Sequence, residues 1–312
     1  MKSLWRKPVY LFVGICILLL CLWLTPGFAA QTVRVIRSLE PAQSALAVQK
    51  QMLNDGFIQG IVLEADAILP VPMDEARRVL FANYVQDKTQ DLVVSYKELG
   101  FKEQNDPREI MADLSVSVNT PVLKKMLKDM GIFYTSLHRV SCALTLTGFQ
   151  SEDWQHLEEL QTLSGVDVIY GGNQPDAVTM QLNKVGENRW QGKLTAWDSD
   201  FTAQGRTLDV LWSELWKNYF SLPKVMSGIF STVTFQVAGW YVTDGASYFE
   251  DILLSWDRLV EQATLLRLDM TDADFGGVWS VQTLDVQALR TRLEAFLKDR
   301  GLHLLFFQQT KV

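Results

Sequence analysis

Two short stretches decide how most of this chain is expected to fold: CALTLTGF (142–149) and VTFQVAGW (233–240). In both, apolar residues alternate with polar or small ones, which is the period of a strand with one buried face. Both end in a glycine followed by an aromatic residue, and a segment with the spacing of an amphipathic helix follows each of them. We therefore predict that one small α/β unit occurs twice in the chain.

The two units continue with a similar order of elements but with different endings. Residues 138–222 predict βαβββα, and residues 223–312 predict βαββαβ, which is the split plan of ferredoxin-like folds. The fold class is therefore α+β, with small α/β sandwich modules in series, the last two being ferredoxin-like or a variant of that plan. The predicted strands of these two units cover 140–147, 166–170, 177–182, 190–197, 233–240, 263–270, 277–284 and 302–307, and the helices cover 151–164, 208–220, 248–260 and 286–297.

Residues 30–137 form the first predicted module, which begins with a polar lead. Its first strand is GIVLEADAIL (60–69), which two prolines end, and a long helix follows from 73 to 99. The next strand, 111–119, alternates apolar and polar residues. A proline then opens a helix over 121–131, which a glycine stops.

One part of this module carries a family resemblance. The ADAIL strand (65–69), the DEARR helix start (74–78), the strand at 114–119 and the PVLKKMLKDMG helix (121–131) resemble the N-terminal module of the flagellar assembly protein T family and related exported envelope proteins. The resemblance covers residues 57–135. It implies a structural role near a motor or another machine of the cell envelope.

The N-terminus predicts export. Residues 1–29 combine three basic residues, an uncharged apolar run (8–24), a helix-breaking Pro26-Gly27 pair and small residues up to Ala29, which is the pattern of a Sec-type signal peptide. Cleavage after Ala29 is the preferred interpretation. The alternative is an uncleaved anchor, because the apolar run is near the lower limit for spanning a bilayer. Either way, we expect the body of the protein in the periplasm or on the extracytoplasmic face of the inner membrane.

The charge balance limits the classes of partner that the chain is expected to bind, and the cysteine count limits its disulfide chemistry. The chain has 29 Lys and Arg against 36 Asp and Glu, and three of the basic residues lie in the signal segment. This acidic balance argues against nucleic acid and against an anionic membrane surface as main partners, so a membrane contact is expected only through a retained signal segment. Cys142 is the single cysteine beyond the signal and cannot form an internal disulfide; we interpret it as a small buried hydrophobic residue rather than as a reactive thiol.

No pattern in the sequence predicts a reaction. There is no GxSxG elbow, no Gly-rich phosphate loop and no paired-cysteine motif, and the segment around His156 lacks the HExxH spacing of a zinc site. DMTDADFGG (269–277) is interpreted as a hairpin turn, because Thr283 stands where a calcium-binding loop needs a bidentate Glu. Asp198 and Asp200 would act as acid and base only if a cleft brought them a partner. We therefore predict no enzyme activity, no metal and no cofactor.

The remaining candidates are aromatic. Of the ten tryptophans, most fall on predicted apolar faces, where their size suits core packing. Trp190 and Trp197 are expected on opposite faces of one strand, so that at least one of them is exposed; with Asp198 they are the candidate contacts for a ligand or partner. The leading hypothesis is a non-enzymatic envelope scaffold or interaction subunit that binds other envelope proteins. The alternative is a periplasmic module that binds a glycan, peptide or lipid in a cleft between the two repeats.

Overall fold

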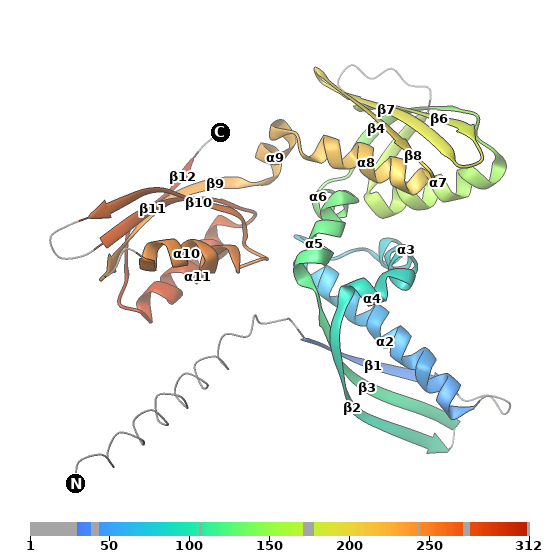
Figure 1. Ribbon diagram of the computed structural model, residues 1–312, viewed down its shortest axis with the longest axis horizontal. Coiled ribbons are helices and arrows are strands. Elements are labelled where there is room, and N and C mark those ends of the chain that lie inside the picture. The colour runs from blue at the N-terminus through green and yellow to red at the C-terminus, as the bar shows by residue number, and fades with distance from the viewer. Residues whose placement is uncertain are drawn as a thin grey trace, which may run out of the picture.

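The computed structural model describes residues 30–38, 44–105, 108–170, 178–241, 244–270 and 275–310. The predicted signal peptide (1–29) lies outside these ranges, as do Asp272 and Asp274 of the acidic segment. Over the described ranges the chain is α+β, which confirms the predicted class, and it forms three separate sheets (Figure 1). Along the same ranges, no helix is both long and apolar enough to cross a membrane.

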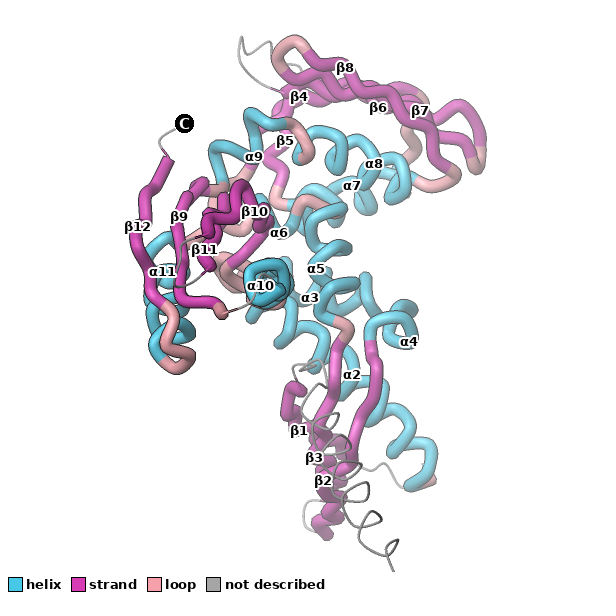
Figure 2. The backbone as a smooth tube through the Cα atoms, turned by 60° about the vertical axis from the view of Figure 1, so that its left-hand side comes forward, coloured by secondary structure: helices cyan, strands magenta, loops and turns pink. Residues whose placement is uncertain are grey.

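The first module is a three-stranded antiparallel sheet, in the order β1-β3-β2, with one long helix packed along it (Figure 2). Gly56 and Gly60 of that helix face Leu114 and Val116 of β3, where a Cβ on either glycine would press on the sheet. The lack of side chains at these two positions lets the helix lie close to the strand. The elements are β1 (Ala30–Ser38), α2 (Ala45–Ile68), α3 (Glu75–Val85), η1 (Gln86–Lys88), α4 (Thr89–Leu92), β2 (Val93–Asn105), β3 (Arg108–Val118), α5 (Thr120–Asp129) and α6 (Ile132–Thr135).

Two predictions for this module are wrong. Residues 60–69 are not a strand but the end of α2, whose apolar residues are buried on several sides between β3 and the neighbouring helices. The predicted helix over 73–99 is broken into α3 and the short helices η1 and α4, which end at Leu92, and its last part is wrong because β2 begins at Val93. Two bulges in β2 interrupt its alternation, which is why its apolar residues mimic helical spacing. The predicted polar lead contains β1 and most of α2, whereas β3 and α5 confirm the predicted strand and helix.

The middle module is a five-stranded sheet in the order β5-β4-β6-β7-β8, with α7 and α8 on one side of it (Figures 1 and 2). β4 is parallel to both of its neighbours, and the other pairs are antiparallel. The bounds of β4, α7, β5 and α8 confirm the predicted ones, whereas β8 was not predicted. The elements are β4 (Val140–Thr147), α7 (Ser151–Ser164), β5 (Val166–Tyr170), β6 (Val178–Gly186), β7 (Arg189–Ala196), β8 (Ser199–Gly205) and α8 (Leu208–Phe220), and α9 (Pro223–Ile229) leads to the last module.

The last module is a four-stranded antiparallel sheet in the order β10-β11-β9-β12. The order of its elements along the chain is the predicted βαββαβ. The elements are β9 (Ser231–Trp240), α10 (Asp244–Leu254), β10 (Val260–Met270), β11 (Phe275–Thr283), α11 (Val286–Lys298) and β12 (His303–Thr310).

The two stretches that open the repeated units share their local ending but not their place in the sheet. Gly148 and Gly239 both have positive φ, at 75° and 110°. The following aromatic rings turn back onto a tryptophan, Phe149 at 5.1 Å from Trp190 and Trp240 at 5.4 Å from Trp279. The first strand of the middle module lies directly beside the second, however, whereas β11 separates β9 from β10 in the last module.

The first and middle modules share one apolar core, and the last module has its own. One large cluster of buried side chains runs through both the first and the middle module, from Val33 to Phe230. The last module has a separate cluster, from Val233 to Leu297. The first two modules are therefore packed as one body, and the last module is a second one.

Candidate functional site

Trp190 is part of the core of the middle module. It lies near the start of β7, is only 4% exposed, and packs edge-on against Phe149. The ammonium of Lys184 lies 5.2 Å from its ring centroid. The ring is therefore enclosed by protein and presents no face to a ligand.

Trp197 and Asp198 form the two-residue turn between β7 and β8. They are therefore not part of the strand, and the expected relation between Trp190 and Trp197 as opposite faces of one strand is wrong. Trp197 is 45% exposed and has a φ of 51°, the single positive φ of a non-glycine residue along the described ranges. A bulky residue in this left-handed region costs about 1–2 kcal/mol.

The strained turn places the Trp197 ring on the corner between α8 and α9. The ring stacks on Tyr219 of α8, with centroids 6.0 Å apart and planes 17° apart, and the Lys224 ammonium of α9 lies 4.4 Å from its centroid. Aromatic stacking and a cation–π contact each contribute on the order of 1 kcal/mol, which is comparable with the cost of the turn. Trp197 thus fastens the segment that leads to the last module, and Asp198 is exposed beside it.

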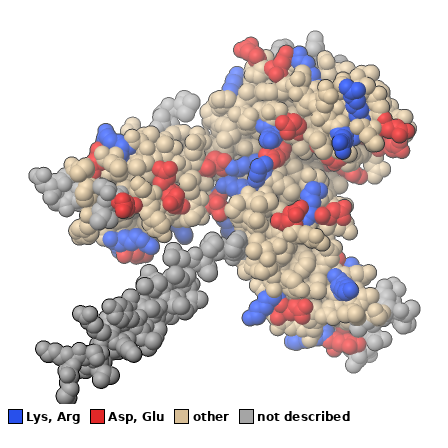
Figure 3. All heavy atoms as spheres, in the orientation of Figure 1, with Lys and Arg blue, Asp and Glu red and all other residues tan. Residues whose placement is uncertain are grey.

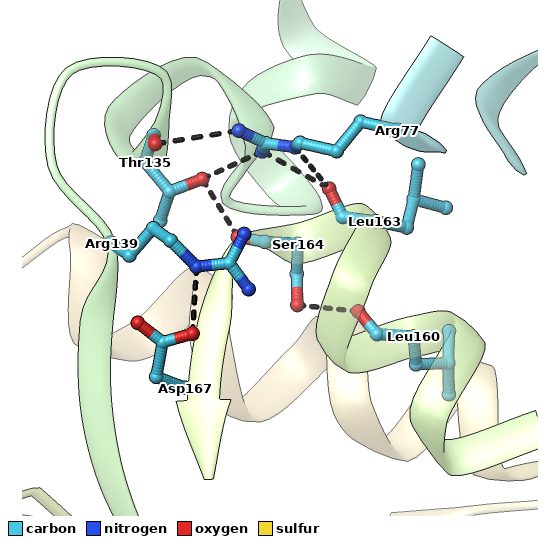
Figure 4. Close-up of polar contacts among 7 residues, drawn as sticks. All are labelled: Arg77, Thr135, Arg139, Leu160, Leu163, Ser164 and Asp167. Carbon is cyan, nitrogen blue, oxygen red and sulfur yellow. Dashed lines mark hydrogen bonds and ion pairs between the residues drawn. The ribbon is translucent and has the colours of Figure 1, made fainter. Parts of the chain in front are cut away.

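A buried arginine joins the first module to the middle one (Figure 4). Arg77 of α3 is 5% exposed, and its guanidinium donates to the carbonyl of Leu163 from Nε at 3.2 Å and from Nη2 at 3.0 Å. Nη2 also donates to Thr135 Oγ1 at 2.8 Å, and Nη1 lies 3.4 Å from the Thr135 carbonyl. Thr135 Oγ1 in turn donates to the carbonyl of Ser164 at 2.7 Å. One side chain of α3 therefore ties together the ends of α6 and α7.

Arg77 is a buried cation that has no carboxylate as an ion-pair partner, and its position between helix ends explains why this is tolerated. Burial lowers the pKa of its guanidinium, which shows the cost of removing the charge from water. The compensating groups are carbonyls at the C-terminus of α7 and the end of α6, where the helix dipole favours a positive charge. Gly165, with a φ of 68°, ends α7 and leaves room for this contact, because a Cβ there would lie 2.6 Å from Thr135 Oγ1 and 3.2 Å from Arg77 Nη2.

The contact between the first and last modules contains a cluster of charged groups, and Leu284 of the last module also packs against the large apolar core. Lys124 and Lys128 of α5 both pair with Glu261 of β10, Lys124 at 3.5 Å, and Lys124 Nζ also donates to the carbonyl of Asp257 at 2.5 Å. Burial lowers the pKa of Lys124. The Phe133 ring lies beneath both ammonium groups, at 5.9 and 5.3 Å. Figure 3 shows basic and acidic side chains gathered where these two parts of the molecule meet.

A buried carboxylate lies next to this contact. Glu64 of α2 is 1% exposed and accepts hydrogen bonds from Gln31 Nε2 at 2.6 Å and Thr120 Oγ1 at 2.9 Å. Arg258, from the loop before β10, lies 3.9 Å from it. Two neutral donors and one cation thus stabilise the buried charge.

A cavity of about 430 Å³ opens between these groups. Glu64 and Thr120 line it from the first module, and Trp256, Arg258 and Arg292 line it from the last. The Arg292 guanidinium lies 5.5 Å from the Trp256 ring, so one wall offers an aromatic surface next to positive charge. The cavity therefore lies between the first and last modules, not between the two repeats where the sequence placed a cleft.

The open face of the middle sheet carries a second hollow, of about 490 Å³. Most of the side chains that line it are hydroxyls and amides of β4, β6, β7 and β8, among them Thr145, Gln181, Asn183 and Gln191. The positive group in this wall, Lys193, is paired with Asp200 at 2.7 Å. This face is polar and nearly uncharged.

The groups of the middle module with shifted pKa values lie at different places, and one pair of them, His156 and Asp209, is in contact. His156 of α7 bonds to Asp209 of α8 at 2.8 Å, and this hydrogen bond raises the pKa of the imidazole. Asp200 has a lowered pKa through its bonds to Lys193 and Thr195. Burial raises the pKa of the Cys142 thiol to about 12. Among the residues with described positions, no three His, Cys, Asp or Glu side chains lie close enough together to hold a metal ion.

The residues that join the modules were not found by sequence reasoning. Arg77 stands in the DEARR helix start, where nothing distinguishes it from an exposed arginine. Glu64 gave a usable signal, because it is one of only two acids in the apolar run GIVLEADAIL, with Asp66, and a charge in such a run must be exposed or paired.

The chain matches no family model, no curated protein and no solved structure. The resemblance of residues 57–135 to the flagellar assembly protein T family therefore stays a prediction. The function has to be inferred from the joints and surfaces of the modules.

Proposed function

We propose that this protein is a non-enzymatic, exported scaffold or interaction subunit of the cell envelope. Its partners would be other envelope proteins, in a flagellar motor or another assembly that spans the envelope. It would act in the periplasm or on the extracytoplasmic face of the inner membrane, as the signal-like N-terminus predicts.

The observation that carries this proposal is the exposure of apolar side chains on outer strands. β2 and β10 are outer strands of their sheets, and each has described strand partners on one side only. Val94, Tyr96 and Leu99 of β2 are exposed, and so are Leu266, Leu268 and Met270 of β10. Soluble proteins usually protect such edges, and an unprotected apolar edge is suited to pairing with a strand of a partner.

The way the modules are joined supports the same proposal. Arg77 and the shared apolar core hold the first and middle modules in one arrangement. This fixed arrangement holds β2 at a constant distance from β5 and β8, the outer strands of the middle sheet, which suits a structural subunit. We also propose that the last module is ferredoxin-like, because its strand order and antiparallel pairing fit the split βαββαβ plan. The middle module would be a variant in which the first two strands are neighbours.

Site-specific photocrosslinking in cells tests this role. A photoreactive amino acid would replace Tyr96 on β2 or Leu268 on β10, with exposed Ala295 on α11 as the matched control in the last module. We expect crosslinks to envelope proteins from the two strands and none from the control. Crosslinks from neither strand, or equal crosslinks from Ala295, would contradict the proposal. Unchanged motility and envelope integrity after deletion of the gene would contradict it as well.

The ligand-binding alternative is favoured by the cavity between the first and last modules. A ligand there would contact the Trp256 ring and the guanidinium groups of Arg258 and Arg292. Titration with soluble glycans, peptides and lipids should then change tryptophan fluorescence in the native protein but not in Trp256→Phe. The same response in both proteins, or a flat response across the panel, would reject this alternative.

A further inference from the structure

The outer edge of β10 has two halves with different chemistry. Near the start of the strand, the Leu265 N–H donates to Glu250 Oε2 of α10 at 2.8 Å, so a side chain already occupies this part of the edge. A bulge follows between Leu265 and Arg267. Leu266 is the extra residue of this bulge and has no partner on β11. From Arg267 to Met270 the strand pairs with β11 on its inner side, and none of the described strands lies on the outer side of Leu266 to Met270.

This free half alternates apolar and charged residues. Leu266, Leu268 and Met270 are 57%, 45% and 73% exposed. Arg267 and Asp269 stand between them and pair with each other, Nε to Oδ1 at 2.7 Å and Nη2 to Oδ2 at 3.2 Å. Natural edge strands commonly use an inward charge or a proline to prevent pairing, but here three apolar side chains lie in water on an edge that is open to another strand.

The five residues Leu266 to Met270 are complementary to themselves. If two copies of the strand pair in an antiparallel manner about Leu268, each Arg267 stands opposite Asp269 of the other copy. Leu266 then stands opposite Met270, and Leu268 opposite itself. Opposite charges and paired apolar side chains are the favourable cross-strand neighbours in a sheet.

Other ways of pairing lose this match. A shift by one residue would turn the apolar side chains of one copy toward the charged face of the other. An in-register parallel pair would place arginine beside arginine and aspartate beside aspartate. The other outer strand of this sheet, β12, exposes Leu305 and Phe306 but continues with uncharged Gln308 and Gln309, and offers no such complementarity.

We infer that the occupant of this edge is a second copy of the chain, paired antiparallel about Leu268 so that two four-stranded sheets become one continuous sheet. The pairing is a symmetric two-fold contact, in which the same surface of each copy meets itself. It assigns the β10 edge to a second copy and leaves β2 as the strand for other envelope proteins, so a photocrosslink from Leu268 would join two copies of this chain. Because five residues per copy bury less than the roughly 1,200 Å² of a standard stable interface, association should be weak and depend on concentration.

Register-specific disulfides test the inference in the purified full chain. Cys16 and Cys21 are replaced by serine, and Cys142 is retained because it is buried. In Leu268→Cys, the two cysteines would face each other across the two-fold axis, with Cα atoms about 4.5–5.5 Å apart, which is within disulfide range. In Leu266→Cys, they would lie about 14 Å apart along the strands, which is too far.

Under mild oxidation we expect at least a tenfold higher disulfide-linked dimer yield from Leu268→Cys than from Leu266→Cys. An equal mixture of Leu266→Cys and Met270→Cys, distinguished by a mass tag on one of them, should form the mixed dimer, because these two residues face each other. Equal yields from Leu268→Cys and Leu266→Cys, or no mixed dimer, would overturn the inference.

Charge reversal provides an independent test in the Leu268→Cys protein. Arg267→Asp places carboxylates opposite each other and should reduce the dimer yield severalfold, and adding Asp269→Arg should restore it. Far-UV circular dichroism and the melting temperature show that each variant is folded, since both side chains are on the surface. A double variant that stays as poor as Arg267→Asp would overturn the proposed register.

Discussion

Replacing Arg77 by methionine should weaken the joint between the first and middle modules. Methionine keeps much of the apolar stem but removes every donor of the guanidinium. The Leu163 carbonyl then loses both of the N–H groups that it accepts from, and Thr135 Oγ1 loses its contact at 2.8 Å. These acceptors are buried, so water does not readily replace the lost donors.

The size of the effect follows from these contacts. An unsatisfied buried acceptor costs about 1–3 kcal/mol, and hydrogen bonds to a charged donor are worth about 1.5–3 kcal/mol. The lowered pKa of Arg77 shows that burying its charge costs free energy. Because methionine carries no charge, this cost disappears in the variant and offsets part of the loss. We expect a loss of about 3 kcal/mol in the free energy of unfolding. At about 2–4 °C per kcal/mol for a unit of this size, the melting temperature should fall by roughly 6–12 °C.

The measurement is thermal unfolding followed by near-ultraviolet circular dichroism, with hydrogen exchange over residues 132–136 and 160–166. Arg139→Met is the matched control, because Arg139 pairs with Asp167 at 2.7 Å on the surface, where both side chains are exposed (Figure 4). Such a pair is worth under about 1 kcal/mol. If Arg77→Met lowers the melting temperature no more than Arg139→Met, the buried joint does not stabilise the molecule as argued.

Three further predictions concern single side chains. Glu261→Gln removes the carboxylate that pairs with both lysines of α5, which should loosen the contact between the last and first modules. Small-angle scattering should then show a larger radius of gyration, and 1 M salt should have the same effect on the native protein. An unchanged radius of gyration in both cases would contradict this prediction. The pKa of His156 is raised above its ordinary value of 6.5, and the pKa of Asp209 is lowered. Near pH 5 this ion pair should therefore make the native protein more stable than His156→Gln by under about 1 kcal/mol, and the difference should disappear as pH rises toward 8. A difference in stability that grows with pH would refute this prediction. Gly165→Ala should destabilise by at least about 1–2 kcal/mol, since the residue has a φ of 68° and a Cβ would meet Thr135 Oγ1; an unchanged melting temperature would contradict it.

The elements that the sequence predicted well are those whose burial follows one regular period. The alternation of β4 and the apolar stripe of α8 each face a single core, and their predicted bounds are correct. The burial of α2 and of β2 does not follow one regular period. α2 is buried on several sides, so its apolar residues run together as in a strand, and the bulges of β2 break its alternation.

The candidate contacts depended on details that no local pattern carries. The predicted exposure of one tryptophan is correct for Trp197, but its cause is a strained turn rather than strand alternation. The partners of Arg77 lie 58 and 86 residues away in the chain. Without knowledge of how the modules pack, a buried arginine of this kind cannot be told from the half-exposed Arg78 beside it.

The two joints differ in the forces that hold them, and this difference indicates how the molecule moves. The first and middle modules share apolar side chains, whose attraction depends little on salt, and Arg77 selects one arrangement among them. The last module meets the rest of the molecule through a cluster of charged groups and the partly buried Leu284, and salt screens the charged contacts more strongly than the apolar ones. Phe230 is buried in the large core and stacks near Phe133 at 6.3 Å, one residue before β9 begins. The last module should therefore detach as a unit and turn about the chain between Phe230 and Ser231, carrying the β10 edge with it, while the rest of the molecule keeps its shape.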